Sequence, residues 1–173
     1  MSERLIGIGD IHGCYHTLKD LMAAIEYDAK TDTLVFIGDY IDRGPHSYRT
    51  VQYLRKLQAY ATRDKVICLR GNHEQMAIDA CGELQWPWVA NGADETLMDY
   101  AAHEAYIDMD LAWFRSLPLC YDTPEIFFCH AGLTHPKISD NIAEDVLWGR
   151  DWIERDSRPR EKQVIFGHTP DPR

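Results

Sequence analysis

The first half of the chain alternates between short apolar runs and longer segments whose apolar residues recur every three or four positions. Short β-rich runs are typical of buried strands, and the longer pattern is typical of helices with one buried face. The expected strands are Arg4–Gly9, Thr33–Gly38 and Lys65–Leu69, and the expected helices are Cys14–Tyr27, Ser47–Ala61 and His73–Leu84. This β-α-β-α-β order predicts a parallel sheet with right-handed crossovers.

The second half has a different pattern. Residues Gln85–Leu117 are rich in Trp, Tyr, Ala and acidic residues, which indicates helical segments broken at Trp86-Pro87-Trp88 and Asn91-Gly92. Strand-like runs return at Leu119–Asp122, Glu125–Cys129 and Gln163–Gly167. We therefore predict one α/β domain over residues 1–173, with a helical insertion at about 85–117, rather than two domains.

Composition and charge exclude several classes of protein. Of the 173 residues, 45% are hydrophobic and 27% are charged, as in ordinary globular proteins. The formal net charge of −10 disfavours a general nucleic-acid binder, which would carry a basic excess. No apolar run approaches the ~18 residues of a membrane span, and residues 1–4 lack the apolar segment of a secretory signal. We expect a soluble, cytoplasmic monomer with neither nucleic acid nor membrane as a partner.

The cysteines do not change this picture. The five cysteines contain no C-x-x-C pair. A disulfide framework or a cysteine-type zinc ribbon is therefore a poor interpretation, and reduced thiols are the better one.

Polar residues that can bind metal or phosphate follow five of the six expected strands. The motifs are Gly9–Gly13 (GDIHG), Gly38–Gly44 (GDYIDRG), Arg70–Glu74 (RGNHE), His130–Gly132 (HAG) and Gly167–Thr169 (GHT). Open α/β sheets build their sites at the carboxyl ends of strands, and glycine allows the backbone to turn sharply close to a ligand. We expect these five segments to meet at one site.

These motifs supply a set of metal ligands. The candidate ligands are Asp10, His12, Asp39, Asn72, His130 and His168. Imidazole, carboxylate and amide oxygen together suit first-row ions such as Mn, Fe and Zn. Two ions ~3.5–4 Å apart need a shared ligand, and Asp39, central in the series, is the natural bridging carboxylate. Helix capping could account for Asp10 or Asp39 alone, but it does not require histidines beside them and at two later strand ends.

Taken in order, these motifs resemble the PPP-type serine/threonine protein phosphatases of the calcineurin-like metallophosphoesterase superfamily. The bacterial and phage lambda phosphatase-like branch is the most similar. Arg70–Asp79 (RGNHEQMAID), Trp88–Thr96 (WVANGADET) and Trp148-Gly149-Arg150 also resemble that branch, and the similarity covers residues ~5 to 170. The resemblance implies an α/β sandwich of β-sheets with flanking helices.

The resemblance also implies roles for the matching residues. Asp10 and His12 would hold one divalent ion, Asn72, His130 and His168 the other, and Asp39 both. Manganese is the expected ion, with iron or zinc as alternatives. A hydroxide between the ions would attack phosphorus in line, because a bound ion lowers the pKa of its water.

Four more residues have roles implied by the resemblance. Arg43, Arg70 and Arg150 match phosphate-binding arginines, whose planar forks suit tetrahedral oxyanions. His73, oriented by Asp42, matches the general acid. Serine and threonine alkoxides are poor leaving groups, so a proton donor beside the metal ions is needed.

Three functions are compatible with these residues. The first is a metal-dependent phosphomonoester hydrolase of the protein serine/threonine phosphatase type. The second is a diadenosine-polyphosphate (Ap4A-type) hydrolase, and the third is a non-catalytic binding module. The Asp42–His73 pair favours phosphomonoesters, because an anhydride has a better leaving group, and the intact ligand set argues against the third.

The substrate would be a phosphorylated protein or a small phosphorylated compound. Its identity would depend on the 85–117 insertion and on a loop at Pro136–Asp145. Only five residues follow His168, so we expect that the family's C-terminal strands are absent from this sequence.

Overall fold

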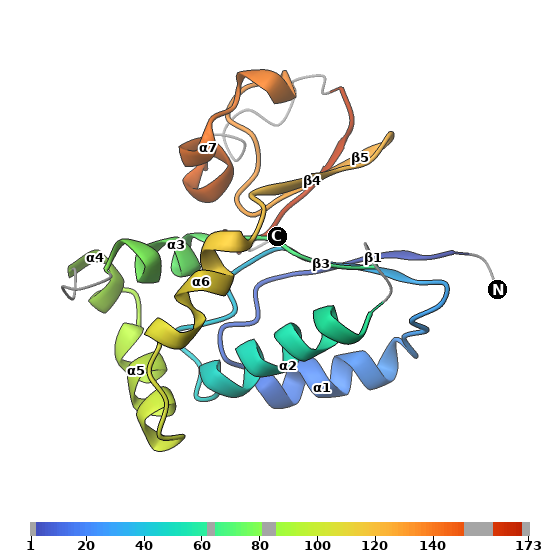
Figure 1. Cartoon of the computed structure of the whole chain (residues 1–173). Helices are drawn as coiled ribbons and strands as arrows, with labels where there is room; N and C mark the ends of the chain where they lie inside the picture. The colour runs from blue at the N-terminus through green and yellow to red at the C-terminus, as the bar shows by residue number, and fades with distance from the viewer. Residues whose placement is uncertain (1–2, 62–64, 81–85, 151–160, 171–173) are drawn as a thin grey trace.

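Two three-stranded sheets stack face to face, and helices cover the outer side of each sheet (Figure 1). This computed structural model describes residues 3–61, 65–80, 86–150 and 161–170. The arrangement is an α/β sandwich, as the resemblance implied.

The first sheet comes from the alternating first half of the chain. Its strands are β1 (Leu5–Ile8), β2 (Thr33–Phe36) and β3 (Val66–Cys68), in the order β1-β2-β3 and all parallel. Helices α1 (Tyr15–Ala24) and α2 (Ser47–Tyr60) connect them and lie against one face of the sheet (Figure 1). The predicted parallel β-α-β-α-β unit is confirmed.

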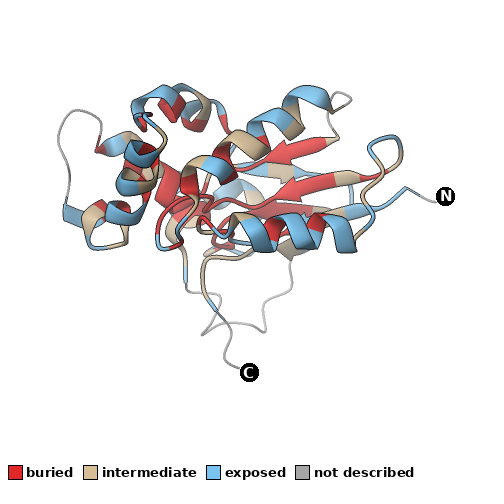
Figure 2. Ribbon diagram, turned by 90° about the horizontal axis from the view of Figure 1, so that it is seen from below, coloured by how far each residue is buried: buried red, intermediate tan, exposed pale blue. Residues whose placement is uncertain are grey.

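Alternation along β2 explains how a central strand is buried on both faces (Figure 2). Leu34 and Phe36 belong to the large hydrophobic core that contains residues of α1 and α2. Val35 and Ile37 point the other way, into a smaller cluster with Phe128 of the second sheet. Successive side chains of a strand face opposite sides, so one strand contributes to both cores.

The second sheet contains β4 (Cys120–Asp122), β5 (Ile126–Cys129) and β6 (Gln163–Ile165). β5 lies in the middle, antiparallel to β4 and parallel to β6. Helix α7 (Ala143–Trp148) contributes Val146 to a cluster with Phe127 and Cys129 of β5, on the side away from the first sheet.

The loop expected at Pro136–Asp145 is partly helical. It contains a short 3₁₀ helix, Ile138–Asp140, and the start of α7. The side chain of Asp145 accepts a hydrogen bond from the backbone N–H of Ile142 at 2.8 Å. This contact satisfies a donor at the beginning of α7, which explains how a polar segment starts a helix.

Four helices follow the first sheet: α3 (Asn72–Asp79), α4 (Trp86–Val89), α5 (Ala93–Ala102) and α6 (Asp108–Ser116). They gather at the carboxyl ends of its strands (Figure 1). Buried Asp110 of α6 joins α6 to α2 and α5, because it accepts hydrogen bonds from Gln52, Arg55 and Tyr100. The helical character expected for the insertion is therefore present in its described residues.

Two helices are shorter than their sequence pattern predicts. The helix expected at Cys14–Tyr27 ends at Ala24, because Glu26 takes a left-handed backbone conformation with φ of 49°. The helix expected at His73–Leu84 begins at Asn72 and ends at Asp79, and the rest of the expected range up to Leu84 lies outside the described residues apart from Ala80. Among the described helices, none is both long and apolar enough to cross a bilayer.

Candidate metal centre

The predicted ligands lie in the turns, or at the start of the helix, that follow the strands of both sheets. His12 follows β1, Asp39 follows β2 and Asn72 follows β3. His130 follows β5, and His168 follows β6. The carboxyl ends of parallel strands open at the same edge, so residues far apart in the sequence meet there.

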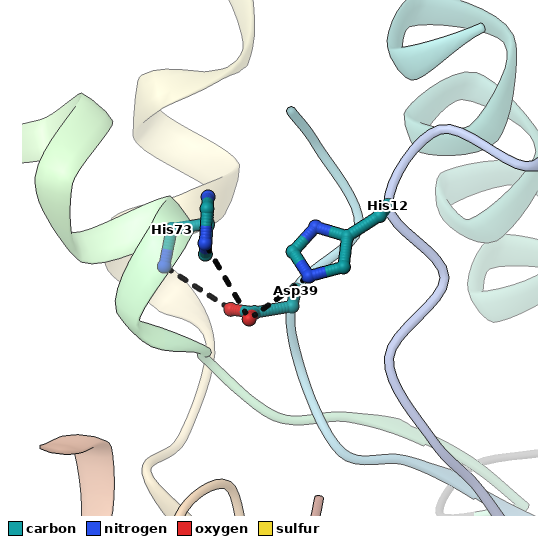
Figure 3. Close-up of side chains that lie close together, drawn as sticks. All are labelled: His12, Asp39 and His73. Atoms are coloured by element: carbon teal, nitrogen blue, oxygen red, sulfur yellow. Dashed lines mark hydrogen bonds and ion pairs between the residues drawn. The ribbon is translucent and has the colours of Figure 1, made fainter. Parts of the chain in front are cut away.

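The first group consists of His12, Asp39 and His73 (Figure 3), whose potential ligand atoms lie within 4.8 Å of one another. Asp39 Oδ2 is 3.5 Å from His12 Nε2 and 3.9 Å from His73 Nε2. The Nδ1 atom of His12 lies 2.8 Å from the carbonyl oxygen of Ile41. A carbonyl only accepts, so Nδ1 carries the proton of the neutral ring and the Nε2 lone pair faces the group.

The second group shares Asp39 with the first and adds His130 and His168. Asp39 Oδ2 is 3.4 Å from His130 Nε2, and His130 Nδ1 faces the carbonyl oxygen of Ile37 at 2.9 Å. Asn72 Oδ1 lies 2.8 Å from His130 Nε2 and 3.0 Å from His168 Nδ1. Asp39 is therefore the common member of two adjacent groups, as a bridging ligand must be.

The electrostatics of the second group favour a cation. Burial opposes ionisation of Asp39, but the surrounding imidazoles, His130 foremost, hold the pKa of its carboxyl well below the usual range. Burial lowers the pKa of His130, but Asp39, and to a smaller extent Asp10, outweigh it and raise that pKa to about 9. A proton on His130 Nε2 thus supplies positive charge where these ligand atoms converge, and an ion binding there must displace it.

The imidazole of His168, in contrast to that of His130, is neutral. Burial, followed by the positive charges of His130 and Arg150, lowers the pKa of His168 to about 4. Burial also lowers the pKa of His12, although Asp39 opposes the shift. Once an ion displaces the extra proton of His130, imidazoles, a carboxylate and an amide oxygen form a donor set that fits first-row divalent ions.

Asp10 lies beside these groups without being part of either compact set. Its two carboxylate oxygens accept the backbone N–H of His168 at 3.2 and 3.0 Å. A Cβ atom at Gly167 would lie 2.2 Å from Asp10 Oδ1, so a larger residue at this position would displace the Asp10 carboxylate. The structure brings Asp10 to the site, and its role as a ligand stays a prediction.

His73 forms a buried pair with Asp42. His73 Nδ1 lies 2.6 Å from Asp42 Oδ2, and both side chains are almost inaccessible to solvent. The carboxylate holds the Nδ1 proton, so Nε2 is the atom that faces Asp39 and the centre. The structure places Asp42 beside His73, and the role of the pair in proton transfer stays a prediction.

The three predicted phosphate-binding arginines lie in different surroundings. Arg43 donates from Nη1 to His12 Nε2 at 2.9 Å and from Nη2 to His73 Nε2 at 3.0 Å. Arg150 donates from Nε to His168 Nε2 at 3.3 Å. Both guanidinium groups therefore border the centre.

Arg70 is placed differently. Its guanidinium donates to the carbonyl oxygens of Phe114, Arg115 and Leu117, at the C-terminal end of α6, and to the side chain of Gln75. Carbonyl oxygens at the end of a helix carry partial negative charge, so a cation there is favoured by the helix dipole. The structure does not bring this guanidinium into either group, so phosphate binding by Arg70 stays a prediction.

Backbone strain is concentrated at this site. Seven described non-glycine residues have positive φ, and five of them are predicted site residues: His12 at 44°, Asp39 at 55°, Asp42 at 70°, Arg43 at 67° and His168 at 66°. Such conformations cost about 1–3 kcal/mol each and persist where the surrounding structure imposes them. Their clustering supports a functional site at these turns.

Sequence reasoning missed Glu74, which organises the turn around Asp39. This buried carboxylate accepts the backbone N–H groups of Asp39, Tyr40 and Gly71 at 2.8–2.9 Å. Burial and the nearby charge of Asp39 raise the pKa of Glu74 to about 7. The available signal was its position three residues after Gly71, where a glutamate reaches back to the start of a helix.

Comparisons with known proteins agree with this geometry. A family model described as calcineurin-like phosphoesterase matches residues 3–173. Serine/threonine-protein phosphatase 1 of Salmonella typhimurium is 32% identical, over 94% of this chain and 77% of that protein. A symmetrical bis(5'-nucleosyl)-tetraphosphatase of Janthinobacterium is 34% identical over 84% of this chain, which spans only about half, 52%, of that relative.

A solved structure has a similar fold. The crystal structure of a proposed diadenosine tetraphosphatase superposes with a TM-score of 0.65 at 20% identity, over 97% of this chain and 80% of that one. Identity at this level supports the fold alone.

Proposed function

Because this chain belongs to the calcineurin-like phosphoesterase family, we propose that it is a metal-dependent hydrolase of phosphoserine and phosphothreonine in proteins. The chain is a metallophosphoesterase by family, and the choice of substrate is the part that we propose. The relationship to a bacterial serine/threonine phosphatase, over 77% of that protein, supports the proposal.

Two divalent ions fit the donor set described above. Asp39 would be shared, His12 and Asp10 would complete one ion, and Asn72, His130 and His168 would complete the other. Bound there, the ions would supply Lewis acidity toward phosphoryl oxygens and a water molecule of lowered pKa. Manganese is the ion that we expect, with iron and zinc as alternatives.

Residues of this chain would bind and orient the phosphate. Arg43 contacts His12 of the first group, and Arg150 contacts His168 of the second group. A planar guanidinium matches a tetrahedral phosphate with two parallel hydrogen bonds. On substrate binding, these side chains would exchange their contacts with imidazole nitrogens for contacts with phosphate oxygens.

The observation that carries the substrate proposal is the His73–Asp42 contact of 2.6 Å. With its Nδ1 proton held by the carboxylate, His73 can deliver a proton only from Nε2, which faces Asp39. A proton donor at that point is needed most for an alkoxide leaving group, because alkoxides are strongly basic. The geometry therefore favours serine and threonine phosphates over anhydrides.

A second candidate is hydrolysis of dinucleoside tetraphosphates. The name of the Janthinobacterium relative supports it, since that protein is 34% identical to this chain. The leaving group in that reaction is a nucleotide phosphate, which departs without much help from an acid. The two candidates therefore differ in how strongly they depend on His73.

The experiment compares manganese-loaded wild-type protein and His73→Asn on a phosphoserine peptide, p-nitrophenyl phosphate and diadenosine tetraphosphate. We expect the wild type to favour the peptide over the tetraphosphate. His73→Asn should lose about 10²–10⁴-fold in kcat on the peptide, because that is the usual contribution of a general acid. The loss on p-nitrophenyl phosphate should be much smaller, because its phenolate leaves readily.

His135→Asn is the matched control, because His135 is exposed and lies outside both groups. If His73→Asn lost equal factors in kcat on the peptide and on p-nitrophenyl phosphate, His73 would not be the general acid. A wild-type preference for diadenosine tetraphosphate would instead select the second candidate.

A further inference from the structure

The turn that carries Asp42 and Arg43 is held by a segment of the helical insertion, residues 88–96, which belongs to α4, α5 and their connection. We propose that Trp88 and Thr96 are positioning residues for His73, which they control through the carboxylate of Asp42. This inference rests on the proposed role of His73 as the proton donor.

Both oxygens of the Asp42 carboxylate have a donor from the insertion. Trp88 Nε1 donates to Oδ2 at 2.8 Å, and Thr96 Oγ1 donates to Oδ1 at 2.6 Å. His73 Nδ1 contacts the same Oδ2 at 2.6 Å. Asp42 and Thr96 are fully buried, and Trp88 is 3% exposed, so the network is shielded from bulk solvent.

Two donors from different directions fix the plane of the carboxylate. A carboxylate held at one oxygen can still rotate about its Cβ–Cγ bond, which would swing the bond to His73 out of line. With Oδ1 held by Thr96 and Oδ2 by Trp88, only one orientation satisfies all contacts. The carboxylate then fixes the tilt of the His73 ring, as partners of a functional histidine commonly do.

The same segment also holds the strained backbone of the turn. Thr96 Oγ1 accepts the N–H of Asp42 at 2.8 Å, and the carbonyl oxygen of Gly92 accepts the N–H of Arg43 at 3.4 Å. A Cβ atom at Gly92 would lie 3.0 Å from the Arg43 nitrogen, and Gly92 has φ of 96°. Asp42 and Arg43 are consecutive left-handed residues, so such support is needed to keep them there.

The insertion therefore has a part in proton transfer in addition to any part in substrate choice. A displacement of α4 or α5 would reach His73 through two hydrogen bonds, Trp88 to Asp42 and Asp42 to His73. Kinetically, loss of this support should lower kcat for substrates that need the acid, with little change in KM.

The test uses two pairs of variants with manganese-loaded protein. Trp88→Phe keeps the ring but removes the donor, and Trp86→Phe is its control because Trp86 is 77% exposed. Thr96→Val removes the hydroxyl, and Thr96→Ser restores it. We expect Trp88→Phe and Thr96→Val to lose about 10- to 100-fold in kcat on a phosphoserine peptide, a usual effect of removing such a supporting contact. Their losses on p-nitrophenyl phosphate should be small, and both controls should resemble the wild type.

A second readout is independent of turnover. The Nδ1 proton of His73, in a 2.6 Å contact with Asp42, should give a strongly downfield proton resonance in histidine-labelled, metal-free protein, identified by its absence in His73→Asn. Trp88→Phe and Thr96→Val should shift or broaden this resonance, whereas Trp86→Phe and Thr96→Ser should not.

The outcomes separate the two proposals. Unchanged peptide turnover together with an unchanged resonance in Trp88→Phe and Thr96→Val would overturn the positioning role, even if His73 is the acid. A shifted resonance with equal effects on both substrates would keep the positioning role and reject the acid. Thermal melting identifies a variant that does not fold. If one of the two test variants does not fold, the other variant and its control test the proposal.

Discussion

At the scale of single residues, Asp39 is the member that both groups of candidate ligands share. Its Oδ2 atom lies 3.5 Å from His12 Nε2 on one side and 3.4 Å from His130 Nε2 on the other. Its low pKa keeps the carboxylate charged at neutral pH. An uncharged side chain of the same shape would remove the attraction for both ions at once.

We therefore expect Asp39→Asn to lose both divalent ions, whereas His168→Ala should lose mainly one. Elemental analysis after gel filtration in manganese would give the number of ions per chain. Asp20→Asn is the control, because Asp20 is an exposed residue of α1. Two tightly bound ions in Asp39→Asn would contradict the bridging role.

Residue types at strand ends were predictable from the sequence, but the direction of a long side chain was not. His12, Asp39, Asn72, His130 and His168 converge because the strands before them end at one edge. Arg70 belongs to the same motif as Asn72, yet its guanidinium reaches the end of α6, a contact across 44–47 residues. Trp88 and Thr96 were missed as partners of Asp42 for the same reason, since their contacts span 46 and 54 residues.

At the scale of elements, the start of β1 is tied to the end of α1 and to the turn before β2. Arg4 donates to both carboxylate oxygens of Asp32 and to the carbonyl oxygens of Ile25 and Glu26. The hydrogen bonds from Arg4 lower the pKa of Asp32 to about 2. The side chain of one arginine thus links the strand, the helix and the turn of the first β-α-β unit.

Because of this contact, the free energy of unfolding should depend on pH in the acid range. Asp32 has a lower pKa in the folded chain than the ~3.9 of an unfolded one, so its ionised form favours folding above about pH 4. That contribution is lost as the pH falls from about 4 to 2. Asp32→Asn should therefore melt at a lower temperature than the wild type at pH 7, and the difference should shrink toward pH 2.

Thermal melts across this pH range would test the prediction, with exposed Asp20→Asn as the matched control. A difference between Asp32→Asn and wild type that stayed constant from pH 7 to pH 2 would show that the carboxylate charge is not the cause.

The elements of the first half followed from hydrophobic periodicity, and their ends did not. Helix α1 stops where Glu26 turns left-handed and its carbonyl binds Arg4, a tertiary contact that no local pattern contains. The strand pairing of the second sheet could not be predicted from the sequence either. The antiparallel β4–β5 pair and the distant β6 were recognisable only as strand-like runs, because sheet order depends on long-range packing.

At the scale of the whole molecule, one small cluster and the candidate metal centre both join the two sheets. The cluster contains four buried residues of the first sheet and the following turns, and Phe128 of the second. The centre joins Asp39 after β2 to His130 after β5. Ions bound there would hold both sheets together and favour the folded chain.

Removal of metal should therefore lower the melting temperature. At a free ion concentration 100 times the dissociation constant, each ion would stabilise the fold by about 2.7 kcal/mol. In a chain of this size that corresponds to roughly 5–10 °C. Calorimetry with manganese and with a chelator would measure the shift, and Asp39→Asn should show none. An equal shift in Asp39→Asn would mean that the stabilising ions bind elsewhere.

The left-handed backbone at Arg43 has a consequence for how the sequence can change. Arg43 is exposed, so its φ of 67° is not compensated by burial of its side chain. Glycine adopts this conformation without the steric penalty that other residues meet. A library sorted for heat resistance alone should drift toward glycine at position 43, whereas a library sorted for turnover should return arginine.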